Sequence, residues 1–237
     1  MQVQLLDFVA GARAARGVAV VIDVFRAFTV ACHAIARGAT RIIPMEDADE
    51  ALALRHIYPD CFTIGEREGR RIAGFDCNNS PTELEASSLA GRTVVQTTSA
   101  GTRGLTNATG ADVVLTGALV NAAAVCAYIR QLAPTTVSLV RMGVAALEHS
   151  DADDACSELI AARLLGRPFD ERGIPERLRG SVEARKFFDP AAHWAPERDF
   201  ELCTQLDRFG FVLRLTPQPD GLRALVPIPV QLQQPRP

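Results

Sequence analysis

The sequence VAVVI, from Val18 to Ile22, is a continuous apolar run that is rich in β-branched residues. A run of this kind is typical of a strand that is covered on both faces, as in a parallel sheet between two helix layers. Residues 27–37 follow with a helical pattern that ends before Gly38. Together they predict a strand and then a helix, which is the repeating unit of α/β folds.

This alternation continues along the first two-thirds of the chain. Further strands are predicted at residues 40–44, 61–64, 94–96, 113–115 and 136–140, and further helices at 46–57, 119–132 and 153–165. The rhythm indicates an α/β protein, and we predict a three-layer α/β/α architecture with a mainly parallel or mixed central sheet.

The last third of the chain has a different composition. Residues 166–196 are rich in charge, Pro and Gly, and we expect them to wrap the surface before a helix near residues 198–206. Two closing strands are predicted near residues 211–215 and 222–226. We expect one domain over residues 1–230, with two similar subdomains as the alternative, and a disordered tail over residues 231–237.

Composition narrows the classes of partner. The net charge of −3 argues against a nucleic-acid partner, which usually requires a basic surface. No apolar run reaches the ~20 residues needed to cross a bilayer, so no membrane partner is expected. Residues 1–17 lack a signal-peptide pattern, and the six cysteines are scattered without a C-x-x-C pair. Free thiols of this kind indicate a reducing cytoplasm.

Polar residues follow several of the predicted strands. Asp23 and Arg26 come after the first strand, Glu66 and Arg67 come after CFTI, and Asp153 lies beyond the strand at residues 136–140. Ligands bind beyond the carboxyl ends of the strands in parallel α/β sheets. Each residue alone is more simply explained as a solvated loop residue, but the set together predicts a functional cleft.

Asp23 and Arg26 allow two interpretations each. An acid at the end of an apolar strand must be paired, hydrogen-bonded or bound to a metal, and carboxylates suit Mg²⁺. The competing interpretation of Asp23 is a cap of the following helix. Arg26 is suited to bidentate phosphate binding, whereas an ordinary surface arginine is the alternative.

The stretch TTSAGTRG, residues 97–104, combines hydroxyls, glycines and an arginine directly after a predicted strand. Glycines let the backbone approach a phosphate closely, and successive N–H groups can form an anion-binding nest. The hydroxyls and Arg103 would add direct hydrogen bonds. A tight strand-to-helix connection is the alternative, and the loop is not a Walker A motif because the G-K-[ST] ending is absent.

The segment GFDCNNSPTELE contains a helix-start signal. Ser80, Pro81 and Glu83 form an S-x-x-E capping box with Pro at the first helical position, so a helix is predicted to begin at Pro81. The N-terminus of that helix, with Asn79 beside it, would face an anion or would simply be capped. Asp76 is equally compatible with a metal ligand and with a turn.

Taken in order, the motifs VVIDVFRAFT, ARGATRIIP, IGEREGRRIAGFDCNNSP, TTSAGTRGL and ERDFELCTQLDRFGFVLRL resemble the 2-phosphosulfolactate phosphatase family. The resemblance extends from about Val18 to Val226. It implies an α/β/α fold and Mg²⁺-dependent hydrolysis of 2-phospho-3-sulfolactate to 3-sulfolactate and phosphate, a step towards coenzyme M. Three positions depart from the family pattern: Ser99 and Ala100 replace the third Thr and the Asn of a T-T-T-N-G-T loop, and Asn78 replaces a Gly.

The resemblance implies three groups of site residues. Residues expected to carry catalysis are Asp23, Arg26, Glu66, Thr98, Thr102 and Arg103. Residues expected to bind the substrate are Arg67, Asn79, Ser80, Thr97, Ser99 and Gly101. Residues expected to hold Mg²⁺ are Asp23, Glu66, Asp76 and Asp153. The nucleophile is either a metal-activated water or Asp23 itself, and Arg67 or Arg71 would pair with the substrate's carboxylate or sulfonate.

The expected partner is therefore a small, phosphorylated, multiply anionic substrate, and a homodimer is left open. Two rival functions remain at the level of sequence. One is a phosphatase for another small anionic phosphoester, and the other is a non-catalytic protein that binds a phosphorylated metabolite.

Overall fold

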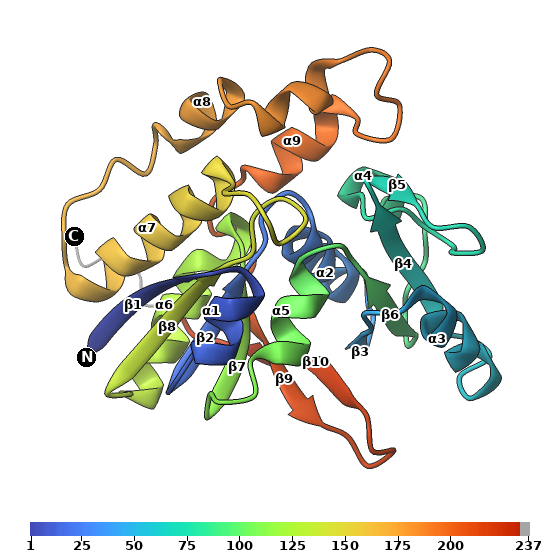
Figure 1. The fold of residues 1–237 in the computed structure, drawn as a ribbon, viewed down its shortest axis with the longest axis horizontal. Helices are drawn as coiled ribbons and strands as arrows, with labels where there is room; N and C mark the ends of the chain where they lie inside the picture. The colour runs from blue at the N-terminus through green and yellow to red at the C-terminus, as the bar shows by residue number, and fades with distance from the viewer. Residues whose placement is uncertain (233–237) are drawn as a thin grey trace.

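Ten strands form one sheet in the order β1-β8-β2-β7-β9-β10-β3-β6-β4-β5 (Figure 1). The computed structural model describes residues 1–232, so most of the predicted tail at 231–237 lies outside the described residues. The strands are β1 (Gln2–Asp7), β2 (Val18–Ile22), β3 (Arg41–Pro44), β4 (Phe62–Arg67), β5 (Arg70–Arg71), β6 (Thr93–Thr97), β7 (Val113–Gly117), β8 (Thr136–Arg141), β9 (Phe211–Pro217) and β10 (Arg223–Pro229).

The helices lie on both faces of this sheet. They are α1 (Phe8–Ala14), α2 (Ala27–Ala36), α3 (Ala48–Ala53), α4 (Pro81–Leu84), α5 (Gly101–Asn107), α6 (Ala122–Leu132), α7 (Asp151–Leu165), α8 (Ile174–Arg179) and α9 (Glu197–Cys203). Three short 3₁₀ helices, η1 (Leu54–His56), η2 (Leu119–Asn121) and η3 (Glu183–Phe188), complete the set. Within residues 1–232, no helix has both the length and the apolarity of a membrane span.

Strand β2 shows why the sheet needs two helix layers. All five of its side chains are buried. Ala19 and Val21 belong to the core that packs under α1, α2 and α5. Val20 and Ile22 belong to the opposite core, which α6 and α7 cover. The continuous apolar run therefore reflects burial on both faces, and the predicted three-layer α/β/α fold is confirmed.

The sheet is mixed because it consists of two parallel groups. Strands β1, β8, β2 and β7 run parallel to one another, as do β3, β6 and β4. The antiparallel pair β9–β10 lies between the groups. It meets β7 through the register pair Leu115–Arg214 and β3 through Ile42–Leu225. The two closing strands thus occupy the centre of the sheet.

Two regions depart from the sequence-based expectations. The chain begins with an edge strand, β1, whose residues are all exposed or partly buried and which carries no β-branched run that would have revealed it. Residues 166–196 were expected to wrap the surface, and they do so with two further elements, α8 and η3. We call residues 166–203, which run from the end of α7 through α9, the C-terminal strap. Figure 1 shows the strap crossing above the ends of the central strands.

Candidate active site

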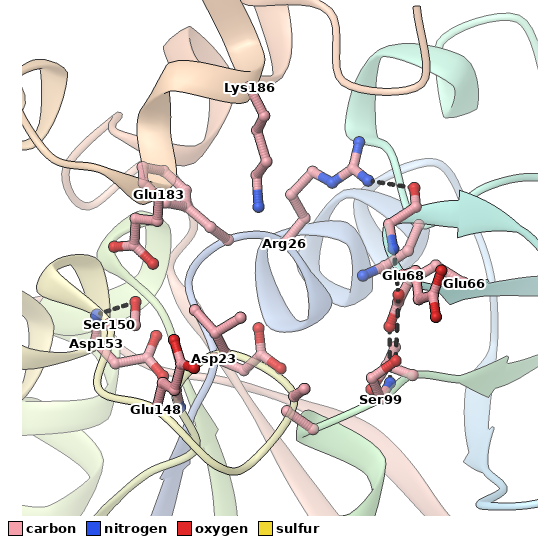
Figure 2. A pocket seen from close by; sticks show the side chains of 18 of the residues that line it. Asp23, Arg26, Glu66, Glu68, Ser99, Glu148, Ser150, Asp153, Glu183 and Lys186 are labelled. Atoms are coloured by element: carbon pink, nitrogen blue, oxygen red, sulfur yellow. Dashed lines mark hydrogen bonds between the residues drawn. The ribbon is translucent and has the colours of Figure 1, made fainter. Parts of the chain in front are cut away.

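A cavity of about 720 Å³ lies where the loops after β2, β4, β6 and β8 meet the C-terminal strap (Figure 2). Its volume is within the range of roughly 300–1,000 Å³ that is usual for small-ligand sites. The strand loops and the start of α7 contribute Asp23, Arg26, Glu66, Thr98, Ser99, Ala100 and Asp153, and Asn79 borders the same space. The strap contributes Val182, Glu183, Lys186 and Trp194.

Asp23 lies in the gap between β2 and α2 and is 7% exposed. Its Oδ1 accepts a hydrogen bond from the backbone N–H of Ala27 at 3.2 Å. A Cβ on Gly101 would come within 2.8 Å of Oδ2, so the glycine permits the start of α5 to approach this carboxylate. Burial and the charge of Glu66 raise the pKa of Asp23 to about 7, although N–H groups of Ala27 and Gly101 oppose the shift.

Glu66 ends the buried part of β4 and joins two loops of the site. Its Oε1 accepts from the backbone N–H of Ser99 at 2.7 Å, and its Oε2 accepts from the N–H of Gly69 at 2.8 Å. The Ser99 hydroxyl also donates to Oε2, at 3.2 Å. Because one carboxylate holds both segments, Glu66 fixes the loop after β6 relative to the turn after β4 (Figure 2).

Asp153 performs the same task on the opposite side of Asp23. Its Oδ1 accepts from the N–H of Val24 and its Oδ2 from the N–H of Gly143, both at 2.8 Å. Ser150 caps α7 by accepting from the Asp153 N–H, which sets the carboxylate at the first turn of the helix. Burial and the neighbouring Asp23 raise the pKa of Asp153 well above its usual value.

Two hydroxyls of the TTSAGTRG loop, those of Thr98 and Thr102, are each hydrogen-bonded to the backbone of the other residue. The Oγ1 of Thr98 accepts from the Thr102 N–H, and the Oγ1 of Thr102 accepts from the Thr98 N–H, both at 3.1 Å. This reciprocal pair closes the turn into α5 and accounts for two of the hydroxyls. Thr98 and Ser99 border the cavity, whereas Thr97, Gly101 and Thr102 are buried just behind it.

Arg26 is buried and its guanidinium is already occupied. Its Nη1 donates to Oδ2 of Asp199 at 2.6 Å and to the carbonyl of Trp194 at 2.9 Å. Its Nη2 donates to the carbonyl of Gly69 at 3.0 Å. Arg26 therefore joins the sheet to the strap at the rim of the cavity, in addition to any contact with a ligand.

Asp199 extends this junction to α4. Its Oδ1 accepts from the Ser80 hydroxyl at 2.8 Å and from the Thr82 N–H at 3.0 Å. Ser80 caps α4 through the Glu83 N–H, and α4 begins at Pro81, so the predicted helix start is confirmed. The Glu83 carboxylate accepts a hydrogen bond from the N–H of Asn78, whereas a capping box would have it accept from the N–H of Ser80.

Seven of the predicted site residues do not line the cavity. Four of them are buried: Ser80, Thr97, Gly101 and Thr102. The other three are Arg67, Asp76 and Arg103. The Arg67 guanidinium bonds to the carbonyls of Glu66 and Glu46. The Asp76 carboxylate accepts from Thr63 and from Arg55, each at 2.8 Å, at the far end of β4. Arg71, the alternative partner for a substrate anion, donates to the Asp76 carbonyl at 3.4 Å.

The sequence reasoning missed the side chains that the strap adds. Lys186, Glu183 and Trp194 line the cavity, and Asp199 holds Arg26. Lys186 is the only lysine in the chain, and this was the one signal that could have drawn attention to it. Its distance in sequence from the strand-end motifs gave no reason to place it among them.

The cavity carries an excess of negative charge. Its border includes the acids Asp23, Glu66, Glu68, Glu148, Asp151, Asp153 and Glu183, against the cationic side chains of Arg26 and Lys186. Within residues 1–232, no three His, Cys, Asp or Glu side chains converge tightly enough to hold a metal ion by themselves. Mg²⁺, however, usually takes one or two carboxylates and completes its shell with water and phosphate oxygens. The donor set fits such a shared site around Asp23 and Asp153 and does not fit an all-protein cage.

Comparison with known proteins gives a consistent result. The family described as 2-phosphosulpholactate phosphatase matches residues 7–218. A protein of Bacillus subtilis named "Probable 2-phosphosulfolactate phosphatase" is 33% identical over 197 residues, which is 83% of this chain and 86% of the relative. Proteins with the same name are 30% identical in Clostridium acetobutylicum, over 84% of this chain and 88% of the relative, and 42% identical in Deinococcus radiodurans, over 53% of each.

Proposed function

The chain belongs to the 2-phosphosulfolactate phosphatase family, and from this premise we propose that it hydrolyses 2-phospho-3-sulfolactate to 3-sulfolactate and phosphate. The observation that carries the proposal is the position of Asp23. This buried carboxylate borders a cavity of suitable size, and its pKa is raised to about 7, close to the pH at which an acid–base group is most effective. Perturbed carboxylates in clefts of this kind are typical of catalytic sites.

The chain's own residues would divide the work as follows. Asp23 would either accept a proton from the attacking water, or attack phosphorus itself to give an aspartyl phosphate that water then hydrolyses. In either route the P–O bond to the sulfolactate oxygen breaks and that oxygen takes up a proton. The Ser99 hydroxyl and the backbone around Thr98 would face the phosphoryl oxygens, because Glu66 holds this loop at the border of the cavity. Asp153 would keep the loops after β2 and β8 in place through Val24 and Gly143.

We also propose that the reaction requires Mg²⁺. The seven acids around the cavity repel a polyanionic substrate, and a divalent cation at Asp23 and Asp153 would offset this repulsion. When bound, the ion would supply charge neutralisation at the phosphate oxygens and activation of water. Glu66 borders the same cavity, and both of its oxygens, like those of Asp153, already accept hydrogen bonds, so either would hold the ion through a remaining lone pair. Asp76 lies outside the cavity border, so we do not include it in this site.

Three further expectations also stay proposals. They are the place of the reaction in coenzyme M biosynthesis, a cytoplasmic location, and a homodimer. The resemblance suggests the first, the thiol content suggests the second, and the third is open.

A phosphate-release assay tests the proposed function. The purified chain is incubated with 2-phospho-3-sulfolactate, 2-phospholactate, phosphoglycolate and p-nitrophenyl phosphate, with Mg²⁺ or with EDTA. We expect the highest kcat/KM for 2-phospho-3-sulfolactate and loss of turnover in EDTA that added Mg²⁺ reverses.

The other outcomes separate the rival functions. A different best substrate would show that the chain acts on another phosphoester. Saturable binding of every ester without phosphate release would support the non-catalytic binder. Full turnover in EDTA would refute the proposed requirement for Mg²⁺, but it would still support the proposed hydrolysis.

A further inference from the structure

Lys186 projects from the strap into the cavity. It lies in η3, and Figure 2 shows its side chain reaching down between Arg26 and Glu183 towards the region above Asp23. The one arginine that lines the cavity, Arg26, follows β2 on the sheet side. Its guanidinium already donates hydrogen bonds to Asp199 and to two backbone carbonyls. Lys186 is therefore the cation that the strap offers to a ligand.

The ammonium of Lys186 has no acidic partner in the described part of the chain. No carboxylate within residues 1–232 forms an ion pair with it, and the nearest aromatic contact is the ring of Phe187, 5.1 Å from Nζ to the centroid. Burial and the nearby guanidinium of Arg26 lower the pKa of Lys186, although the charges of Glu183 and Asp23 oppose the shift. Buried cations are usually paired, so an anion from outside the chain is the missing partner.

The turn that carries Lys186 is held in place independently of any ligand. Glu183, one turn earlier in η3, accepts a hydrogen bond from the Ala152 N–H at 2.8 Å and so ties η3 to the first turn of α7. Glu183 is thus hydrogen-bonded to the backbone and, although its charge acts on Lys186, it forms no ion pair with the ammonium. The ammonium is held above the cavity by a fixed segment, which is the arrangement that a specific anion contact requires.

We propose that Lys186 determines substrate specificity by binding the second anionic group of the substrate, the carboxylate or the sulfonate, while the phosphate lies against the loops of the sheet. This inference rests on the proposed function, because it assumes a phosphoester that carries a further negative charge. It replaces Arg67 and Arg71 in that role, since the guanidinium of each bonds to backbone carbonyls outside the cavity. The strap then binds the carboxylate or the sulfonate of the substrate, and the loops of the sheet bind its phosphate.

The test compares Lys186→Met, which removes the charge and keeps most of the length, with Lys186→Arg, which keeps the charge. Arg185→Met is the matched control, because Arg185 is exposed, lies one residue away and does not border the cavity. The Mg²⁺-containing assay follows 2-phospho-3-sulfolactate, 2-phospholactate and p-nitrophenyl phosphate, which carries no anionic group besides its phosphate.

For Lys186→Met we expect KM for 2-phospho-3-sulfolactate to rise by about 10- to 100-fold, as for a lost charge-assisted hydrogen bond. The kcat/KM for p-nitrophenyl phosphate should stay within about twofold, because that ester lacks the second anion. Lys186→Arg should restore most of the affinity, and Arg185→Met should behave as wild type. 2-Phospholactate distinguishes the two anions: a similar rise in its KM assigns Lys186 to the carboxylate, and an unchanged KM assigns it to the sulfonate.

An equal loss on 2-phospho-3-sulfolactate and on p-nitrophenyl phosphate would overturn the inference, because Lys186 would then serve the phosphate or the fold. If wild type releases no phosphate from any ester, the proposed function fails, and calorimetric titration with 3-sulfolactate decides on Lys186 separately. Weaker binding to Lys186→Met than to Arg185→Met would uphold the anion contact, and equal binding would refute it.

Discussion

The two walls of the cavity are built on different principles. The sheet wall, made of Asp23, Glu66, Thr98 and Ser99, consists of residues at or just beyond the ends of strands. Backbone N–H groups of the adjoining loops and helix starts hold their side chains. The strap wall, made of Glu183, Lys186 and Trp194, is joined to the sheet through long-range contacts such as Arg26–Asp199. In the proposed mechanism, the chemistry lies on the sheet wall, and selection among substrates lies on a segment that packs against the sheet.

The largest effect is expected from Asp23→Asn on the sheet wall. The amide still accepts from Ala27, so the fold should persist, but it cannot act as a base or as a nucleophile. We expect kcat for phosphate release to fall by about 1,000-fold or more, within the range of general-base removal. Circular dichroism serves as the control for folding. A variant with more than a tenth of wild-type turnover would contradict the role of Asp23.

Asp199→Ala tests the junction between the two walls. It leaves the buried guanidinium of Arg26 without its carboxylate and removes the acceptor for Ser80. We expect the free energy of unfolding in urea to fall by about 3–5 kcal/mol, the usual cost of breaking a buried pair. Glu85→Ala, which breaks the exposed pair Arg198–Glu85, is the matched control and should cost less than about 1 kcal/mol. Equal losses in the two variants would show that the junction is not a special contact.

A smaller effect is expected in the pH dependence of the free energy of unfolding, and it comes from Asp23 on the sheet wall. The pKa of Asp23 is raised from its usual 3.8 to about 7, so the folded state binds this proton more tightly than the unfolded state. The contribution of Asp23 is therefore most favourable below about pH 4, decreases as the pH rises towards 7, and is constant above that.

The difference between Asp23→Asn and wild type isolates this contribution. In EDTA, urea unfolding should show equal stability near pH 4 and a variant that is more stable at pH 8, by on the order of 1–3 kcal/mol. A difference that does not change between pH 4 and 8 would contradict the raised pKa.

The smallest effect is expected from Ala100→Asn, which restores the residue usual at this loop position in the family. Ala100 is 5% exposed and precedes α5, where Thr98 and Thr102 already satisfy each other. We expect kcat/KM on 2-phospho-3-sulfolactate to change by about tenfold or less, the value of one hydrogen bond. A much larger increase would show that the chain has diverged from the family substrate, and Ser99→Thr in parallel would separate the two substitutions.

The sequence predicted the sheet wall better than the strap wall because the physical signals are local. Val18–Ile22 must be a buried strand since all its side chains are apolar, and Asp23 stands out as the first charge after it. The Ser80 cap was also readable, because its partner is only three residues away. These features depend on neighbours in sequence.

The remaining features depend on contacts that no local pattern encodes. Asp199 meets Arg26 across 173 residues and Ser80 across 119 residues. In the sequence, Lys186 is one of several cations in a charged segment, and the packing of η3 against other helices, including its contact with α7, directs it towards the cavity. For the same reason the central place of β9 and β10 was missed, since strand order is a long-range property.

The central hairpin β9–β10 has a consequence for how the protein is made. Translation delivers these strands after the two parallel groups that they connect, so a nascent chain that ends before residue 211 leaves the inner edges of β7 and β3 without partners. Open strand edges are sites of misassociation, and synthesis proceeds at only about 5–20 residues per second. The interval in which chaperones matter most for this chain therefore falls at the end of its synthesis, when nearly all the catalytic side chains already exist.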